Sequence, residues 1–247
     1  MTTLKKDFDE VGYVALRGFL DADEVEELQR ETNRFIEETV STLPEQIVYY
    51  EDKSNPATLK QVQRIHEHDD YFMRLATSEK VVGLAEELLG GPVTIQNMQY
   101  FNKFPRMGKA TPPHQDGYYF MIKPQEALTM WLSLGDADAS NGAVCYVRGS
   151  SRKGMRLHGS TGTLGFSQGI ADWSDEDDRA CVQMEASPGD MLVHHSLTIH
   201  RANNNDSDRD RKSVGFIFYR DDVEIDEEAH AAYQKKLHES LKEQGKL

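Results

Sequence analysis

The stretch PVTIQNMQYFNKF, residues 92–104, marks the point at which the chain becomes β-like in character. It is rich in β-branched and aromatic residues, which suit a pleated, half-buried surface, and it therefore predicts a β-strand. Further stretches of the same texture follow, separated by turns that contain Asn141-Gly142 and Pro188-Gly189. They span residues 128–134, 144–147, 191–196 and 213–219. This succession of short strands predicts an antiparallel barrel or a double-sheet jelly roll.

The chain before this stretch is mostly helical in pattern. A strand-like stretch at residues 13–19 leads to Asp21, which opens a D-x-x-E capping pattern and predicts a helix of about five turns. Ser78 is suited to cap a second helix, which Gly90-Gly91 would end. The fold class that follows is mainly β with flanking helices.

The last part of the chain carries charges at most positions and predicts a C-terminal surface helix at about 226–245. Its charge run favours a solvated face over an interaction helix. Together with a helical part at about 1–91 and a jelly-roll core at about 92–220, this helix belongs to a single domain expected over 1–247.

Composition argues against several classes of protein. The 247 residues are 38% hydrophobic and 28% charged, which supplies enough apolar surface for a core. A net charge of −14 argues against nucleic acid as a partner, because binding to phosphates requires clustered Lys and Arg. No apolar leader stands at the N-terminus, and no run approaches the roughly 18 apolar residues of a membrane-spanning helix. Cys145 and Cys181 are too few for a disulfide framework and fit a reducing compartment, so we expect a cytoplasmic protein whose partner is a small molecule.

His114-Gln115-Asp116 places a histidine and a carboxylate two residues apart. In an extended segment such residues point to the same face, so both side chains could reach one ion. A third ligand would come from another strand, and His200 stands at the end of the strand predicted after the turn at residues 188–190. Two imidazoles and one carboxylate form the facial triad typical of Fe(II) oxygenases, which leaves positions open for a 2-oxo acid and O₂. The H-x-D pattern alone is a weak signal, since a surface histidine near an aspartate is commoner than a metal site.

Arg211 follows His200 by eleven residues, and Ser213 stands two residues further, on the same strand face. This pair is suited to hold a distal carboxylate through charge-assisted hydrogen bonds. The alternative is that Arg211 pairs with Asp208 or Asp210 in the preceding turn.

The sequence at this point resembles a known family. Several motifs match, in order and over roughly residues 7–220, the pattern of the phytanoyl-CoA dioxygenase (PhyH-like) family. They are Gly12-Tyr13-Val14, His114-Gln115-Asp116, Trp131, Asn141-Gly142, Pro188-Gly189-Asp190, His200, Asn204 and Arg211. The resemblance implies a double-stranded β-helix of the cupin-like jelly-roll type that uses iron(II), 2-oxoglutarate and O₂. It also implies hydroxylation with release of succinate and CO₂.

The resemblance, carried over by position, assigns three catalytic iron ligands and a carboxylate clamp. The ligands are His114, Asp116 and His200, and the clamp for 2-oxoglutarate is Arg211, with Ser213 beside it. His194 and His195 compete with His200 as third ligand, because all three lie near the end of one predicted strand. The arginine eleven residues onward selects His200, so the other two are expected to support the ligands or to belong to the core.

Three further residues are expected at the cofactor. Gln99 and Trp131 align with positions that contact the cofactor in the family, and Asn97 shares the strand face of Gln99. Trp131 is equally well explained as a core residue. The chain departs from the family's Pro-Gly-Ser-His at residues 148–151, and His158 is a candidate to replace the missing histidine in space. An aspartate stands at residue 116, where halogenating members carry a small residue, which favours hydroxylation over halogenation.

Two segments without obvious structure, residues 47–68 and 154–178, are candidates to line the mouth of the barrel. Candidate substrate contacts are Tyr49, Lys60, Gln61, Arg64, Lys103, Tyr118, Tyr119 and His158, each of which is singly also explained as solvated surface. This mixture of aromatic and polar side chains suits a small polar metabolite. Aromatic faces and acidic charge would suit the ammonium group of a zwitterionic amine, such as an aminophosphonate or an amino acid, whose anionic end a Lys or Arg would hold. The alternatives are a hydroxylase of an acyl or terpenoid-like natural product and a non-catalytic metal-binding cupin-like protein.

Overall fold

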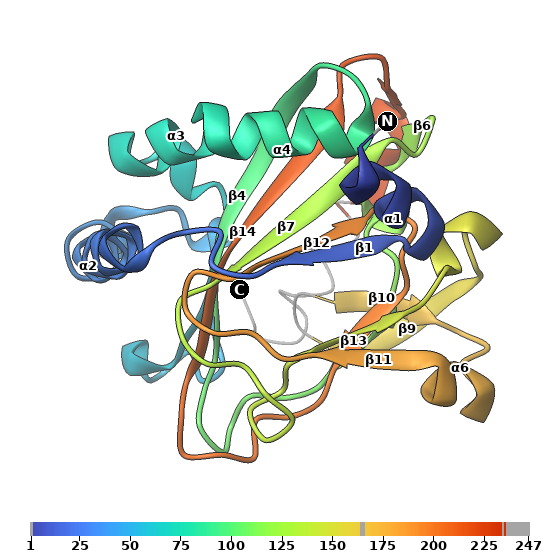
Figure 1. Ribbon diagram of the computed structural model, residues 1–247. Helices are drawn as coiled ribbons and strands as arrows, with labels where there is room; N and C mark the ends of the chain where they lie inside the picture. The colour runs from blue at the N-terminus through green and yellow to red at the C-terminus, as the bar shows by residue number, and fades with distance from the viewer. Residues whose placement is uncertain (1, 164–165, 234, 236–247) are drawn as a thin grey trace.

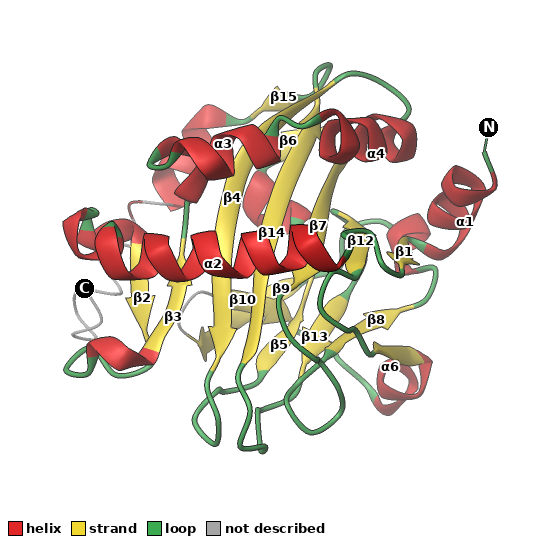
Figure 2. Ribbon diagram, turned by 60° about the vertical axis from the view of Figure 1, so that its left-hand side comes forward, coloured by secondary structure: helices red, strands yellow, loops and turns green. Residues whose placement is uncertain are grey.

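Two antiparallel β-sheets face each other, and helices cover the outer face of the larger sheet (Figures 1 and 2). The computed structural model describes residues 2–163, 166–233 and 235, and it describes only the backbone at 162–163 and 166–167. This arrangement confirms the expected fold class, mainly β with flanking helices around a jelly roll.

The larger sheet has seven strands and the smaller sheet has four. In spatial order, the larger contains β1 (Tyr13–Leu16), β12 (Met191–His195), β7 (Ala127–Ser133), β14 (Arg211–Arg220), β4 (Val93–Lys103), β3 (Leu59–Val62) and β2 (Val48–Tyr50). The smaller contains β11 (Cys181–Met184), β8 (Val144–Val147), β13 (His200–Ala202) and β5 (Thr111–His114). The other strands form two-stranded sheets: β9 (His158–Thr163) pairs with β10 (Phe166–Ile170), and β6 (Ile122–Lys123) pairs with β15 (Glu224–Ile225).

The helices fall mainly before the sheets in the chain. The α-helices are α1 (Thr3–Val11), α2 (Ala22–Glu38), α3 (Asp70–Ala76), α4 (Glu79–Leu89), α5 (Gly117–Phe120) and α6 (Asp175–Ala180). Short 3-10 turns are η1 (Val40–Thr42), η2 (Glu45–Ile47), η3 (Pro56–Thr58), η4 (Ile65–Glu67) and η5 (Ser150–Lys153). The described residues 227–233 and 235 are also helical, and the rest of the expected C-terminal helix lies outside the described residues.

Local capping explains why the two helices predicted from sequence form where they do. Asp21 and Glu24 make the reciprocal capping box at the start of α2, as predicted. Ser78 caps α4, which ends at Gly90 with a left-handed backbone, φ +73°. Both helices place an apolar stripe on the sheet, so their positions follow from sequence signals that lie within each helix.

The main core lies between the helices and the outer face of the larger sheet. Met98 of β4 and Phe216 of β14 are fully buried there against Phe35 of α2 and Leu88 of α4. Burying one such side chain stabilises the fold by about 1.5–3 kcal/mol. The opposite, inner face of the same sheet carries most of the polar residues discussed below, because successive side chains of a strand alternate between faces.

The two segments expected to be irregular are in fact structured. Residues 47–68 contain β2 and β3, which extend the larger sheet beyond β4. Residues 154–178 contain the β9–β10 hairpin and the first part of α6, which begins at a capping box on Ser174. These strands are short and mostly polar, so their pairing rather than their composition defines them. The helix α1 was also not predicted from the sequence.

A tight turn at Pro188-Gly189-Asp190 leads into β12 and packs against the segment between β1 and α2. Gly189 has φ +87°, and a Cβ atom there would lie 2.7 Å from the carbonyl oxygen of Leu20. The buried carboxylate of Asp190 accepts hydrogen bonds from the backbone N–H groups of Gly18 and Ser187 and from Arg17. The motif thus anchors the end of β1 to the start of β12.

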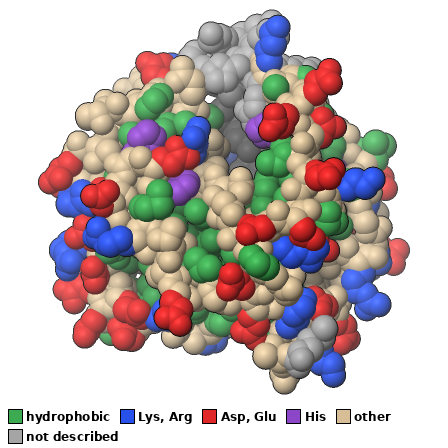
Figure 3. All heavy atoms as spheres, turned by 90° about the horizontal axis from the view of Figure 1, so that it is seen from above, with side chains coloured by type: hydrophobic (Ala, Val, Ile, Leu, Met, Phe, Trp, Pro, Cys, Tyr) green, Lys and Arg blue, Asp and Glu red, His purple; other side chains and the backbone are tan. Residues whose placement is uncertain are grey.

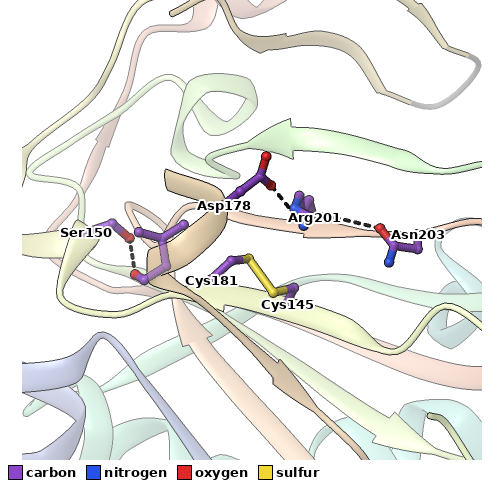
Figure 4. The surroundings of a disulfide bond; sticks show 7 residues. Cys145, Ser150, Asp178, Cys181, Arg201 and Asn203 are labelled. Atoms are coloured by element: carbon purple, nitrogen blue, oxygen red, sulfur yellow. Dashed lines mark hydrogen bonds and ion pairs between the residues drawn. A yellow bond between two sulfur atoms is a disulfide. The ribbon is translucent and has the colours of Figure 1, made fainter. Parts of the chain in front are cut away.

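Cys145 of β8 and Cys181 of β11 form a disulfide across the smaller sheet (Figure 4). Their Cα atoms are 5.7 Å apart. Beside them, Arg201 of β13 pairs with Asp178 at 3.0 Å and donates to Asn203 (Figure 4). The sequence interpretation, which used the two cysteines only as a sign of a reducing compartment, missed this bond.

Charged side chains of both signs are interspersed over the face seen in Figure 3. Among the helices of the described ranges, none combines the length and the apolar character needed to cross a bilayer.

Candidate metal and cofactor site

Three potential metal ligands meet between the two sheets. His114 is the last residue of β5 and His200 the first of β13, and the two are direct partners in the antiparallel register. Asp116 follows a turn after β5, where its helical backbone angles begin α5. The ligand atoms of these three residues all lie within 4.8 Å of one another. The reasoning from an extended H-x-D was therefore correct for His114 only, since the turn brings the carboxylate into place.

The histidines present their Nε2 atoms to Asp116. His114 Nδ1 lies 2.8 Å from the carbonyl oxygen of Pro112, and His200 Nδ1 lies 3.0 Å from that of Thr198. A carbonyl only accepts, so each Nδ1 carries the proton and each Nε2 keeps its lone pair for a metal. These Nε2 atoms lie 3.4 Å and 3.6 Å from Asp116 Oδ1.

Protonation states in the site also suit metal binding. Burial would raise the pKa of Asp116, but the neighbouring His200, His114 and His194 hold that pKa well below its usual range. Burial lowers the pKa of His200 well below its usual value, and the neighbouring His114 and His194 lower it further. A carboxylate beside a neutral imidazole is the state that a cation requires.

The second oxygen of Asp116 faces the larger sheet. Thr129 of β7 donates its hydroxyl to Oδ2 at 2.6 Å, and His194 Nε2 of β12 lies 3.0 Å from the same atom. The Tyr146 hydroxyl of β8 lies 3.1 Å from His194 Nδ1. Thr129 and Tyr146 were not anticipated, because each comes from a strand that reads as plain core.

The competing histidines lie on a different strand from His200. The expectation that all three share one strand was wrong: β12 ends at His195 in the larger sheet, and β13 begins at His200 in the smaller one. His195 turns to the other face of β12, where it contacts Phe8 and accepts from the backbone of Leu197. Its burial, together with His194, lowers its pKa to about 4.

Gln115, between the two ligands of the H-x-D, is fully buried and was also missed. Its amide donates to the carbonyl oxygens of Gly154 and Leu197 and accepts from the backbone of Arg156. Its backbone N–H donates to His158 Nε2 at 3.2 Å. Gln115 therefore fixes the metal-ligand turn to the segments that precede β9 and β13.

Arg211 opens β14 at the inner face and is 7% exposed. Its guanidinium donates to the carbonyl oxygen of Gly142 at 3.0 Å and lies 5.2 Å from the ring of Trp131. Among the described residues, neither its Nε nor the Oγ of the fully buried Ser213 has a hydrogen-bond partner. Burial lowers the pKa of Arg211 to about 10.

The alternative partners of Arg211 are engaged elsewhere. Asp208 pairs with Arg106 at 2.9 Å, and Asp210 accepts from Asn102. In the part of the chain that the structure describes, Arg211 has no acidic partner, so the interpretation of a local ion pair was wrong.

Lys103 lies directly opposite Arg211 in the register of β4 and β14. It is 5% exposed, and its Nζ donates to the carbonyl oxygen of Asn203 at 2.6 Å. Burial, assisted by the charges of Arg211 and Lys60, lowers its pKa to about 6. Lys103, Arg211, Lys60, Gln61 and Thr111 line one narrow cleft. Two buried basic side chains thus lie side by side in this cleft, which we call the anion cleft because their donors are suited to an anion.

The inner face of β4 also carries Gln99 and Asn97. Gln99 accepts a hydrogen bond at 2.6 Å from Gln61 of β3, and both side chains are buried. Asn97 accepts from the backbone N–H of Arg64, whose positive φ of 59° starts the turn into η4. Asn97 thus supports a turn, whereas Gln61 and Gln99 form a pair beside the cleft.

The remaining candidates fall into two groups. Tyr118 and Tyr119 follow Asp116 in α5: Tyr118 stacks on His158 at 4.3 Å, and Tyr119 donates to the carbonyl oxygen of Gln168. Lys60, Arg64 and Tyr49 already have partners away from the metal ligands. They pair with Glu51 at 3.1 Å, with Glu67 at 2.6 Å and with the backbone of Gln46, respectively.

One column of side chains connects these regions along β14. Val214, Phe216 and Phe218 enter the outer core, so alternation places Arg211, Ser213, Gly215, Ile217 and Tyr219 on the inner face. Ile217 pairs in register with Thr129, which holds Asp116. β14 therefore extends from the anion cleft to Ile217, the register partner of the threonine that contacts Asp116.

Comparison with known proteins agrees with this site. The profile of the phytanoyl-CoA dioxygenase (PhyH) family matches residues 8–213. A phytanoyl-CoA dioxygenase domain-containing protein 1 from Danio rerio is 29% identical over 157 residues, which are 62% of this chain and 54% of that protein. A probable alpha-ketoglutarate-dependent hypophosphite dioxygenase from Stutzerimonas stutzeri is 24% identical over 209 residues, 82% of this chain and 73% of that protein.

Solved structures show the same fold. EctD from S. alaskensis with 2-oxoglutarate and 5-hydroxyectoine superposes with a TM-score of 0.74 at 20% identity, over 89% of this chain and 76% of that chain. The epimerase SnoN with Fe3+, alpha ketoglutarate and nogalamycin RO gives a TM-score of 0.73 at 24% identity, over 89% and 83% of the two chains. Because the family profile covers most of the sequence, the chain belongs to the phytanoyl-CoA dioxygenase family.

Proposed function

We propose that the protein is an iron(II)- and 2-oxoglutarate-dependent dioxygenase that hydroxylates a small polar metabolite. The observation that carries the proposal is the His114–Asp116–His200 cluster beside a buried arginine that has no acidic partner in the described structure. The first supplies a facial set of two nitrogens and one oxygen, and the second supplies a receptor for a carboxylate.

The residues present fit both groups. Two Nε2 atoms and one carboxylate oxygen converge, and each imidazole is oriented by a backbone carbonyl. In the anion cleft, the unpartnered Arg211 Nε and Ser213 Oγ are buried donors that a distal carboxylate of 2-oxoglutarate would satisfy. Lys103 would add a second positive charge on the opposite strand.

The bound iron, with O₂, supplies the oxidising chemistry: 2-oxoglutarate loses CO₂ to give succinate, and a C–H bond of the substrate becomes C–OH. The residues of the chain bind and orient the reactants. Arg211 and Ser213 fix one end of the 2-oxo acid, and the site between the sheets excludes bulk water. Asp116 supplies the carboxylate ligand whose loss would make room for halide, which supports hydroxylation over halogenation.

A small polar substrate is supported by the residues near the metal ligands. Tyr118 and Tyr119 lie two and three residues after Asp116, and an aromatic face suits an ammonium group. Lys60 and Arg64 are already paired with glutamates, so the anionic end of a zwitterionic amine, whether an aminophosphonate or an amino acid, would compete with Glu51 or Glu67 for them. The names of two relatives, which mention hypophosphite and 5-hydroxyectoine, also refer to small polar compounds.

Anaerobic titration tests the cofactor part of the proposal. Fe(II) followed by 2-oxoglutarate should produce a visible charge-transfer band in the wild type, and His114→Ala and Asp116→Ala should abolish it. The exposed His68 provides a matched control, since His68→Ala should leave the band unchanged. Absence of the band from the wild type, with no binding of either component, would overturn the proposal.

A succinate-release assay tests the substrate part. The panel contains amino acids, small amines, aminophosphonates, acyl-CoAs and terpenoids, each with Fe(II), 2-oxoglutarate and O₂. Stimulation by a zwitterionic amine is the expected result. Stimulation by an acyl or terpenoid compound alone would replace the proposed substrate class and leave the cofactor assignment standing.

A further inference from the structure

We infer that His194 is a positioning residue that restricts Asp116 to one-oxygen binding of the metal, and that Tyr146 fixes His194 for this role. The inference rests on the proposed metal-binding function and adds to it the means by which this chain orients its carboxylate ligand. It is carried by hydrogen bonds that join both sheets through Asp116.

The two oxygens of Asp116 have separate partners. Oδ1 faces the Nε2 atoms of His114 and His200, whereas Oδ2 accepts the Thr129 hydroxyl at 2.6 Å and lies 3.0 Å from His194 Nε2. To bind a metal through both oxygens, the carboxylate would have to rotate and give up both partners of Oδ2. The larger sheet therefore holds the oxygen that the metal does not use.

The direction of the hydrogen bonds follows from the donor inventory. A carboxylate oxygen only accepts, so the tautomer of His194 that makes a favourable contact with Oδ2 carries its proton on Nε2. In that tautomer Nδ1 is an acceptor, and the Tyr146 hydroxyl, 3.1 Å away, donates to it. The reverse arrangement would place a nitrogen lone pair against the carboxylate. Asp116 thus selects the tautomer of His194, and Tyr146 holds the ring in place through Nδ1.

Tyr146 is itself rigidly placed. It is fully buried, its ring stacks on Tyr13 at a centroid distance of 4.8 Å, and its backbone pairs in register with His200. The neighbour of a metal ligand in the smaller sheet therefore fixes a histidine of the larger sheet, which in turn fixes Asp116. A carboxylate bound through one oxygen leaves more of the coordination sphere open to other ligands.

Co(II) binding measures this role without turnover. The visible d–d bands of bound Co(II) change in intensity with coordination number, so they report a second carboxylate oxygen as well as affinity. His194→Leu should weaken Co(II) binding by about 10–100-fold, the usual effect of removing a partner of a metal ligand, and should alter the band intensity. His194→Gln can donate from a similar position and should recover most of both. Tyr146→Phe should fall between them.

His195→Gln is the matched control, since this neighbouring histidine of the same strand faces away from the metal ligands. It should keep the wild-type spectrum and affinity. Circular dichroism and thermal melting establish that each variant is folded. If His194→Leu does not fold, His194→Gln and Tyr146→Phe still test the inference through the spectrum.

Retention of wild-type spectrum and affinity by His194→Leu would overturn the inference, as would a folded His194→Gln that is as impaired as His194→Leu. Failure of the wild type to bind Co(II) or Fe(II) is a separate result, because it removes the proposed metal site itself. Graded loss from Tyr146→Phe to His194→Leu supports the hydrogen-bonded chain from Tyr146 through His194 to Asp116.

Discussion

Arg211 is buried beside Trp131 without an acid to neutralise it, although a buried charge is costly unless it is paired. Its Nε and the neighbouring Ser213 hydroxyl are the unsatisfied donors of the anion cleft. A bound anion would satisfy these groups, which is the physical support for the proposed clamp.

Arg211→Ala should weaken 2-oxoglutarate binding by roughly 100-fold, about 3 kcal/mol, because a carboxylate in the cleft would lose its charged partner. Arg211→Lys should recover only part of the affinity, since an ammonium lacks the planar fork of the guanidinium. Titration of the anaerobic Fe(II) charge-transfer band measures both. Arg209→Ala, which removes an arginine that pairs with Asp138 at the surface, is the control. Unchanged affinity in Arg211→Ala would remove this residue from the clamp.

Lys103 couples anion binding to pH. Its folded pKa is about 6 and its ordinary value is 10.5, so between these values the unfolded chain binds more protons than the folded one. The contribution of Lys103 to stability is therefore present above pH 10.5 and is lost as the pH falls toward 6. A dianion in the cleft favours the charged ammonium and raises this pKa, so binding at pH 8 should take up about one proton.

Calorimetric titration of the Mn(II)-loaded protein with 2-oxoglutarate, in two buffers of different ionisation enthalpy, measures this proton. Lys103→Met preserves most of the side-chain volume and should abolish the uptake. Equal uptake in the wild type and in Lys103→Met would place the proton elsewhere.

At the scale of secondary-structure elements, Gly189 fixes the tight turn that leads into β12 and contacts the segment after β1. Gly189→Ala should destabilise the protein by about 1–3 kcal/mol, because the residue has a positive φ and a Cβ would approach the carbonyl oxygen of Leu20. The melting temperature should fall by several degrees. Gly135→Ala is the control, since no atom lies within 4 Å of the added Cβ. Equal melting temperatures in the two variants would contradict this role of Gly189.

The elements that the sequence predicted are those with signals inside themselves. α2 and α4 carry their own caps, and β4, β7 and β14 are long enough for their residue types to mark them. β2 and β3 have only three and four residues, too few to show a pattern, and β3 pairs with the edge of β4. β13 has three residues, so the sequence merged it with β12 and misplaced His200.

At the scale of the whole molecule, a disulfide bond links two strands of the smaller sheet, and the composition of the chain did not predict it. The disulfide between Cys145 and Cys181 closes a loop with a sequence separation of 36 residues, which stabilises the folded state by about 3–4 kcal/mol in the chain-entropy picture. Reduction should lower the free energy of unfolding by a similar amount in denaturant titrations.

Mass spectrometry after alkylation under non-reducing conditions should find no modified cysteine in the folded, oxidised protein. The variant with both Cys145→Ser and Cys181→Ser is the control, and reducing agent should not change its stability. Two alkylated cysteines in protein prepared without reductant would show that the pair is open, as the reducing compartment expected from sequence would require.

The residues of the candidate site also differ in whether the sequence could predict them. His114, Asp116 and His200 were found because motif spacing and the resemblance specify them, and Arg211 because it follows at a fixed distance. His194 was expected to support the ligands or to belong to the core, and it does contact Asp116. Thr129 and Tyr146 were not expected, because only the assembled fold brings them to Asp116 and to His194. Residues that support metal ligands stand at no fixed spacing in the sequence, so the structure is needed to identify them.

The inner column of β14 has a consequence for how this catalyst can be altered. Neighbours in the column stand about 6.6 Å apart, so each step from Arg211 toward Tyr219 moves one place further from the anion cleft. Ile217 and Tyr219 pack with Phe120 and Ile122 in a buried cluster, four to eight residues along the strand from Ser213 and Arg211. Changes at these two positions would alter the packing near Asp116 and leave the anion cleft intact, so the two ends of the strand can be varied independently.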